Sequence, residues 1–323
     1  MKLLVVILLT FSLFASGENI KKDAYIEKPP KAKKTVSLVL GSGGARGYAH
    51  IGVIEILEDQ GYEIKSISGS SMGALIGGLY AAGKLEAYKK WILNLDTFEV
   101  LKLIEFSFDS GGMIDAEKVY ESIREIIGDV KIEDLPIPYT AVSSDINNRK
   151  KVWFQKGKLI DAIRASIAIP TIFTPVVKDE MLLVDGGVLS PLPLDPVAQD
   201  PTDITIAVNL NAKTSHRYDI NISQEQKEQE NKLYKEVLRL YNEVSKVIDD
   251  DSPKKKNVDI FYVLGQTLDA TQDIISEHDI EKYKPDIIID IPRDSCESYE
   301  FDKGYMMIEI GKMAAKESLK KKE

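Results

Sequence analysis

Residues 66–82 read SISGSSMGALIGGLYAA, and this stretch joins a short strand, a sharp turn and a buried helix. The first three residues predict the strand, and the almost wholly apolar run from Met72 predicts a helix covered on all sides. Between them, Gly69, Ser71 and Gly73 form the Gly-x-Ser-x-Gly pattern, which presents a serine on a strained strand-to-helix turn. Ser71 is therefore a candidate nucleophile, and the amides at the start of the helix favour negative charge nearby.

A glycine-rich loop lies upstream, between a strand predicted over 36–40 and a helix predicted over 45–60. Residues 41–47 read GSGGARG, and such glycines allow backbone N–H groups to point at a ligand. One interpretation is an oxyanion hole, and another is a tight turn. A dinucleotide loop or a P-loop fits poorly, because Arg46 occupies the sixth position of the glycine pattern and no Gly-Lys-Ser/Thr follows. We expect Arg46 to bind a nearby carboxylate in preference to a phosphate.

Asp185 supplies a carboxylate after another apolar strand, which is predicted over 181–184. Gly186 and Gly187 follow it and leave its side chain open to approach. The alternative is an ordinary turn aspartate that binds its own backbone. Because the glycine loop, Ser71 and Asp185 each follow a strand, we expect them to meet at the edge where the carboxyl ends of parallel strands lie.

The rest of the chain alternates strand and helix patterns. This alternation predicts an α/β fold with a mainly parallel sheet covered on both faces. With 323 residues, 44% of them hydrophobic, the chain can bury a large core. A polar surface excursion is expected over 211–232. Further strands are expected over 139–142, 151–154, 204–209, 260–264 and 286–291, and helices over 116–127, 159–166 and 232–247.

The group that would take the serine proton is not obvious from the sequence. His50 lies in the first helix, His216 in the polar excursion and His278 in a charged segment, and none follows a strand end between small residues. We therefore favour a Ser71–Asp185 dyad, in which burial raises the pKa of the aspartate and makes it a better base. A Ser-His-Asp esterase that uses His216 or His278 is the alternative.

Net charge and cysteine content exclude some classes of ligand and bound metal. The net charge of −9 argues against nucleic acid as a ligand. The lone cysteine, Cys296, excludes an internal disulfide and a multi-cysteine zinc site.

The N-terminal segment has the pattern of a targeting signal. Lys2 precedes an apolar run, and Ala15-Ser16-Gly17 fits a cleavage site, which predicts a signal peptide over 1–17 and an exported protein. The apolar run is shorter than the ~20 residues that a membrane-spanning helix needs, and an uncleaved anchor is the alternative. Residues 18–34 are rich in lysine and proline and are expected to form a flexible lead-in.

These motifs together resemble the patatin-like phospholipase family. The likeness extends over about 36–197, and residues 198–323 are expected to form a C-terminal α/β extension of the same fold. Ser42 stands where many members of the family have the first glycine of the loop. The segments that carry the resemblance are 43–47, 69–73 and 185–187, which match the family's loop, Gly-x-Ser-x-Gly and Asp-Gly-Gly motifs in order, together with 47–53 and 164–170.

The resemblance implies a three-layer α/β/α fold and a lipid acyl hydrolase that needs neither a metal nor another cofactor. By position in the motifs, Ser71 would be the nucleophile and Asp185 the base. The amides of Gly43 and Gly44 would form the oxyanion hole, with Arg46 nearby. The implied substrate is a phospholipid or lysophospholipid at a membrane or micelle surface, and a simple ester remains open as well.

Two apolar segments are candidates for the lipid-binding slot or a lid. Residues 98–108 are followed by a Gly111-Gly112 pair that could act as a hinge, and residues 169–173 could line the same slot. Ordinary core packing is the alternative for both segments. A third hypothesis for the whole chain is a non-catalytic module that binds a lipid or a partner on the same fold.

Overall fold

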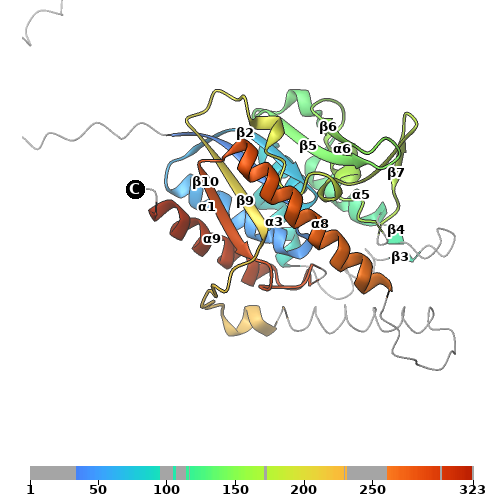
Figure 1. Cartoon of the computed structure of the whole chain (residues 1–323). Coiled ribbons are helices and arrows are strands. Elements are labelled where there is room, and N and C mark those ends of the chain that lie inside the picture. Colours follow the sequence, from blue (N-terminus) through green and yellow to red (C-terminus); the bar gives the residue numbers. More distant parts are fainter. Residues whose placement is uncertain are drawn as a thin grey trace, which may run out of the picture. The chain divides into compact units, whose positions relative to one another are not determined.

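The computed structural model describes residues 34–94, 105–106, 114–115, 117–170, 173–228, 230, 260–298 and 300–321 (Figure 1). Several predicted segments lie outside the described residues. These are the signal peptide over 1–17, the lead-in over 18–34 except for its last residue, the helix over 232–247, and most of the apolar segment over 98–108 with its glycine pair.

An eight-stranded sheet forms the centre of the described chain, in the order β10-β9-β1-β2-β5-β8-β7, with β6 also paired to β5. Neighbours from β10 to β5 run parallel, whereas β6 and β8 run antiparallel to β5, and β7 runs antiparallel to β8. The strands of this sheet are β1 (Thr35–Leu40), β2 (Glu63–Ser70), β5 (Tyr139–Asp145), β6 (Lys150–Phe154), β7 (Val176–Lys178), β8 (Met181–Asp185), β9 (Ile204–Ala212) and β10 (Ile287–Pro292). The short strands β3 (Glu105–Phe106) and β4 (Ile114–Asp115) pair separately.

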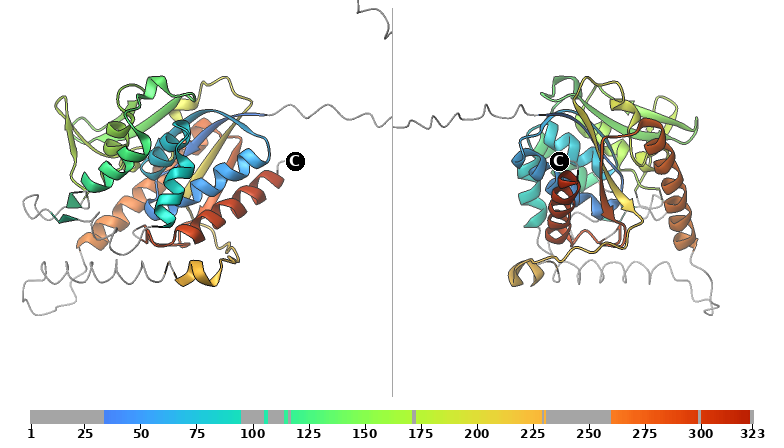
Figure 2. Two further views of the ribbon diagram at one scale, coloured as in Figure 1. Left: turned by 180° about the vertical axis from the view of Figure 1, so that it is seen from behind. Right: turned by 60° about the vertical axis from the view of Figure 1, so that its left-hand side comes forward.

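Helices cover both faces of this sheet, which gives the expected three-layer α/β/α fold (Figures 1 and 2). Helices α1, α2 and α9 lie on one face, and α8 lies on the other. The α-helices are α1 (Ala49–Asp59), α2 (Met72–Ala81), α3 (Leu85–Leu93), α5 (Glu117–Ile127), α6 (Leu159–Ser166), α8 (Ile260–Tyr283) and α9 (Gly304–Lys320). The 3-10 turns are η1 (Gly44–Tyr48), η3 (Ile132–Asp134), η4 (Gly186–Val188) and η5 (Asp195–Val197).

Strand β1 lies in the middle of the sheet and is buried on both faces. Leu38 and Leu40 are fully buried in the large core cluster shared with α1 and α2. Val39 points the other way, into a smaller cluster against which Ile280 of α8 packs. A strand covered on both faces must be apolar at successive positions, which is why its sequence shows a continuous run instead of alternation.

The elements beyond residue 198 belong to the same sheet and layers. Strand β9 pairs with β1 from Val36↔Ile204 to Leu40↔Val208, and β10 pairs with β9. Helix α9 lies against α1, where Gly52 and Gly311 allow close approach: a Cβ at Gly52 would lie 2.0 Å from the Ile308 carbonyl oxygen.

The strand predicted over 260–264 is wrong, because these residues begin the long helix α8. A run of five apolar residues is compatible with either structure, and its periodicity alone does not decide between them. Val263 and Leu264 are exposed on α8, whereas a buried strand would have covered them. The helix predicted over 45–60 begins instead as the 3-10 turn η1 and becomes α-helical at Ala49.

Candidate active site

Ser71 occupies a strained backbone conformation between β2 and α2. Its φ of 57° and ψ of −125° lie outside the regions that non-glycine residues normally adopt. The flanking glycines permit the turn, because a Cβ at Gly69 would lie 2.3 Å from the Gly73 carbonyl oxygen, and one at Gly73 would lie 2.0 Å from the Leu40 carbonyl oxygen. This is the geometry that the Gly-x-Ser-x-Gly pattern predicts.

Strands β2 and β8 approach each other along one edge of β5. Strand β6 occupies the opposite edge, so β2 and β8 share the remaining one. Ser70, the last residue of β2, pairs with Val142, and Asp185, the last residue of β8, pairs with the next residue, Ser143. Ser71 and Asp185 meet as expected, but the expectation that parallel strands bring them together is wrong, because β8 is antiparallel to β5. Asp185 reaches Ser71 because β2 and β8 run in opposite directions and end opposite two adjacent residues of β5, Val142 and Ser143.

The side chains of Ser71 and Asp185 are in direct contact. Ser71 Oγ donates a hydrogen bond of 2.5 Å to Asp185 Oδ2, and the Gly187 amide donates one of 2.7 Å to Asp185 Oδ1. Both residues are buried, with 3% and 6% of their surface exposed. Burial raises the pKa of Asp185 to about 6, although the two hydrogen bonds oppose this shift. A carboxylate with this pKa is a stronger base than an exposed one and is ionised at neutral pH.

The glycine loop lies against the serine turn. β1 pairs with β2 up to Leu40↔Gly69, and a Cβ at Gly47 would lie 2.3 Å from Cβ of Met72, the residue after Ser71. Gly44 has a φ of 54°, and a Cβ there would meet the Ser298 carbonyl oxygen at 2.3 Å. These contacts require glycine at both positions.

The amides of the loop differ in how they are bonded. Those of Gly41, Ser42 and Ala45 donate to the carbonyl oxygens of Val208, Pro191 and Ser298, at 3.1, 2.8 and 2.9 Å respectively. In the described part of the chain, the amides of Gly43 and Gly44 donate no hydrogen bond to a backbone carbonyl outside the helices and strands. They are thus the two loop amides that a ligand could use.

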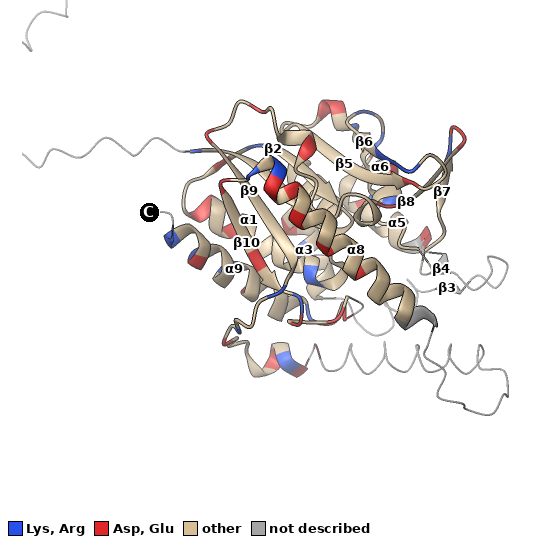
Figure 3. Ribbon diagram, viewed as in Figure 1, with Lys and Arg blue, Asp and Glu red and all other residues tan. Residues whose placement is uncertain are grey.

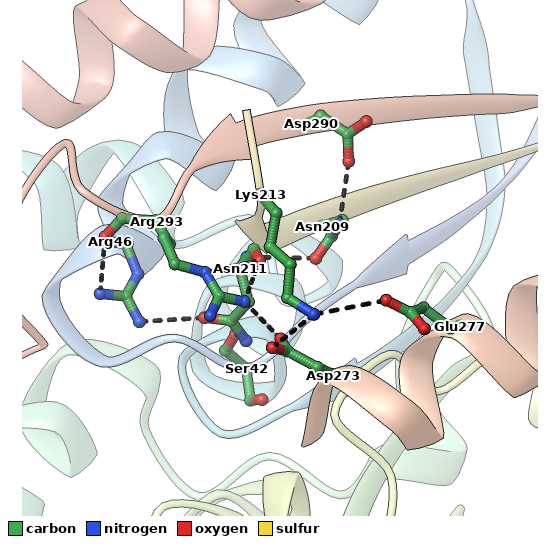
Figure 4. Close-up of polar contacts among 9 residues, drawn as sticks. All are labelled: Ser42, Arg46, Asn209, Asn211, Lys213, Asp273, Glu277, Asp290 and Arg293. Carbon is green, nitrogen blue, oxygen red and sulfur yellow. Dashed lines mark hydrogen bonds and ion pairs between the residues drawn. The ribbon is translucent and has the colours of Figure 1, made fainter. Parts of the chain in front are cut away.

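Arg46 does not bind the carboxylate that we expected. Its guanidinium donates to the carbonyl oxygens of Arg293 and Cys296, at 3.2 and 3.0 Å, and to Asn211 Oδ1 at 2.9 Å. The side chain is buried, and burial lowers its pKa. Arg46 therefore ties the glycine loop to the ends of β9 and β10, and its charged group is occupied by protein oxygens (Figure 4).

The histidines make their contacts away from the Ser71–Asp185 pair. His50 is fully buried, its Nε2 lies 2.9 Å from the Gly41 carbonyl oxygen, and burial lowers its pKa to about 4. His216 Nε2 lies 3.4 Å from Glu317, and His278 Nδ1 lies 3.2 Å from the neighbouring Asp279. All three histidines thus contact groups other than Ser71 and Asp185.

Ser166, at the end of α6, supports the site, although no sequence motif predicts a role for it. Its Oγ accepts a hydrogen bond of 2.9 Å from the Ser71 amide and donates one of 2.5 Å to the Val142 carbonyl oxygen. It therefore links the strained turn to β5. The only signal was its place in the 164–170 segment, because nothing local predicts a contact 95 residues away.

The apolar segment over 169–173 is described only in part, since residues 171 and 172 lie outside the described residues. Among the described residues, no group of three or more His, Cys, Asp or Glu side chains is placed to hold a metal ion. Within the same part of the chain, no helix combines the length and apolar character needed to cross a bilayer.

Comparisons with known proteins identify relatives of this chain. The family model described as patatin-like phospholipase matches residues 38–198. An uncharacterised NTE family protein of Mycobacterium tuberculosis is 37% identical over 327 residues, which cover 88% of this chain and 91% of the relative. Patatin-like phospholipase domain-containing protein 6 of Homo sapiens is 32% identical over 186 residues, 55% of this chain and 14% of that protein. Among solved structures, VipD from Legionella pneumophila aligns with a TM-score of 0.36 and 12% identity over 86% of this chain and 67% of that chain.

The three-layer sandwich is thus a patatin fold. The mycobacterial relative is matched over nearly its whole length at well above 30% identity. The chain belongs to the patatin-like phospholipase family.

Proposed function

We propose that this protein hydrolyses carboxylic esters of lipids, with Ser71 as the nucleophile and Asp185 as the base. The observation that carries the proposal is the 2.5 Å hydrogen bond from Ser71 Oγ to Asp185 Oδ2 at a strained strand-to-helix turn. Family membership supports a lipid ester as the substrate.

In the first step, Ser71 Oγ attacks the ester carbonyl carbon while its proton moves to Asp185 Oδ2. The carbonyl oxygen becomes an oxyanion, which the amides of Gly43 and Gly44 stabilise by hydrogen bonding. Collapse of this intermediate breaks the ester bond, and protonated Asp185 returns the proton to the leaving alcohol. An acyl group is then held on Ser71.

In the second step, Asp185 takes a proton from water, and the resulting nucleophile attacks the acyl-enzyme. The same two amides stabilise the second oxyanion. Ser71 leaves with the proton from Asp185, and a fatty acid is released. One buried carboxylate thus serves both half-reactions, which requires a pKa close to the working pH, as burial provides for Asp185.

We also propose that the substrate is a phospholipid or lysophospholipid presented at a membrane or micelle surface, and that the chain is exported. The substrate proposal follows from the family, and the export proposal follows from the predicted signal peptide over 1–17. Fractionation of cells that produce the full chain tests export: recovery of the protein only from the cytosol would contradict it.

Hydrolysis assays test the chemistry. The full chain, Ser71→Ala and Asp185→Asn are compared on a short-chain aryl ester and on phospholipid vesicles. We expect both substitutions to lower kcat by at least about 10³-fold while the variants remain folded. Asp129→Asn is the matched control, because Asp129 is exposed and forms only a long surface contact of 3.8 Å with Lys158 among the described residues.

Two results would contradict this proposal. Near-normal activity of Asp185→Asn beside an inactive Ser71→Ala would place the base elsewhere and restore a histidine as a candidate. An inactive wild type on both substrates would favour a lipid- or partner-binding module.

A further inference from the structure

We propose that Asn211, the next-to-last residue of β9, is a positioning residue that aims the Gly43 amide at the reacting oxygen. The inference rests on the proposed function, because the Gly43 amide matters only if the glycine loop is an oxyanion hole. Figure 4 shows Asn211 between Arg46 and Arg293, next to Ser42 of the loop.

The geometry of a single peptide unit carries the argument. Asn211 Nδ2 donates a hydrogen bond of 3.3 Å to the Ser42 carbonyl oxygen. That oxygen and the Gly43 N–H belong to the same planar trans peptide, so they point in opposite directions. Holding the oxygen toward Asn211 therefore directs the Gly43 N–H to the opposite side of the loop. The Ser42 amide is fixed as well, by the Pro191 carbonyl oxygen at 2.8 Å.

Arg46 determines which way the Asn211 amide faces. An arginine side chain can only donate hydrogen bonds, so the Asn211 atom 2.9 Å from Arg46 Nη2 must be the oxygen Oδ1. The nitrogen Nδ2 must then face Ser42. The orientation of this side-chain amide, which is ordinarily ambiguous, is thus set by chemistry. The buried Arg46 guanidinium thus donates to Asn211 and to the Arg293 and Cys296 carbonyl oxygens.

The backbone of Asn211 is held equally firmly. Its carbonyl oxygen accepts hydrogen bonds from Arg293, of 2.6 Å from Nη2 and 3.2 Å from Nε, and its amide donates one of 3.1 Å to Asn209 Oδ1. Arg293 also pairs with Asp273 on α8, which is in turn paired with Lys213 at 3.0 Å. This chain of contacts runs from α8 to the glycine loop, and Asn211 is the member that touches the loop backbone at Ser42 (Figure 4).

The test is Asn211→Asp, which keeps the size of the side chain and an acceptor for Arg46. Its second carboxylate oxygen would face the Ser42 carbonyl oxygen and repel it. The Ser42–Gly43 peptide would then rotate, and the Gly43 N–H would no longer point at the reacting oxygen. We expect kcat on an aryl ester to fall by roughly 10- to 100-fold, with KM changed by less than about threefold, because removing one oxyanion-hole donor outright costs about 10²–10³ in kcat.

A second readout separates positioning from a general structural role. The rates on a matched pair of oxo and thiono esters are compared, because sulfur is a weak hydrogen-bond acceptor. The rate on the oxo ester divided by the rate on the thiono ester should fall in Asn211→Asp if the Gly43 amide no longer points at the reacting oxygen. This ratio should stay constant if the variant is only less stable. Asn94→Asp is the matched control, since Asn94 Nδ2 also donates to a backbone carbonyl, that of Lys90 at 2.7 Å, at an exposed helix end.

A folded Asn211→Asp with unchanged kcat and an unchanged rate ratio overturns the inference. In that case, an inactive Ser71→Ala in the same assay shows that the proposed function still holds. If Asn211→Asp does not fold, Asn211→Ala is judged by the same readouts. Unfolding of both variants also overturns the inference, because Asn211 would then be needed for folding as a whole and not for the orientation of the Ser42–Gly43 peptide alone. An inactive wild type overturns the proposed function itself.

Discussion

At the scale of single residues, the site depends on a carboxylate held in an unfavourable environment. Asp185 is buried beside Ser71, and the charged carboxylate has lost most of its hydration. Among the residues that the structure describes, its hydrogen-bond donors are Ser71 Oγ and the Gly187 amide. This environment raises its pKa to about 6 and makes its ionisation visible in both rate and stability.

The dependence of rate on pH follows from that pKa. The proposed base must be ionised to accept the proton of Ser71, so kcat/KM on an uncharged ester should rise with pH and level off above about 6. The measurement is a kcat/KM profile from pH 4 to 9. A profile that is flat through pH 6, or that rises only above pH 8, would contradict Asp185 as the base.

The dependence of stability on pH has the opposite sign. A raised carboxyl pKa means that the folded state holds the proton more tightly than the unfolded state, whose pKa is near 3.8. The stability that Asp185 contributes is therefore fully present below pH 3.8 and is lost as pH rises through about 6, a change of about 3 kcal/mol.

We therefore expect the free energy of unfolding of Asp185→Asn, relative to wild type, to increase between pH 4 and 8. Urea unfolding at both pH values measures this difference, and Asp129→Asn provides the comparison at an exposed position. His50, whose pKa is lowered to about 4, is present in all these proteins, so its contribution cancels in the difference between their free energies of unfolding. A difference that does not change with pH would contradict a raised pKa for Asp185.

At the scale of elements, the site exists because strands and helices approach more closely than side chains would allow. The start of α2 lies against the end of β1, and the start of η1 lies against the segment before α9. In each case a glycine removes the Cβ that would collide with backbone. Backbone collisions cannot be relieved by a change of side-chain rotamer, so these glycines fix the position of Ser71 relative to the loop.

Replacement of Gly73 by alanine tests this account. The new Cβ would lie 2.0 Å from the Leu40 carbonyl oxygen, so the serine turn must move. We expect Gly73→Ala to lower kcat by at least about 100-fold and to destabilise the fold by a few kcal/mol. Gly265→Ala is the matched control, because a Cβ there meets nothing within 4 Å and alanine favours the helix α8. Equal activity of the two variants would contradict the close approach.

At the scale of the whole molecule, the region that matches the family model depends on the rest of the chain. The match ends at residue 198, yet β9 pairs with β1 in the middle of the sheet and α9 packs on α1. Without them, one edge of β1 and one side of α1 would face water. The sheet that positions Ser71 therefore needs residues from both parts of the chain.

A fragment of residues 34–198 should consequently lack a cooperative unfolding transition. The loss of β9, β10 and α9 exposes unpaired strand edge and apolar surface that the remaining core cannot offset. Thermal unfolding followed by circular dichroism compares this fragment with residues 34–323. A fragment that unfolds cooperatively near the temperature of the longer chain would contradict this prediction.

Local sequence patterns predicted much of this architecture. The fold class, the strand before each motif and the strained serine turn follow from apolar runs and glycines, whose effects are local. The direction of β8 and the helical state of 260–264 were not predictable, because tertiary pairing decides them. Ser166 and Asn211 act on residues 95 and 169 positions away, so no nearby pattern could reveal them.

The central claim is that Asp185 activates Ser71 for covalent catalysis. The most direct measurement is the rate of labelling by a fluorophosphonate, with the modified residue identified by peptide mass spectrometry. We predict modification of wild type at Ser71, and labelling of Asp185→Asn slower by at least about 100-fold at pH 8. Labelling at another residue, or equal rates for the two proteins, would contradict the claim.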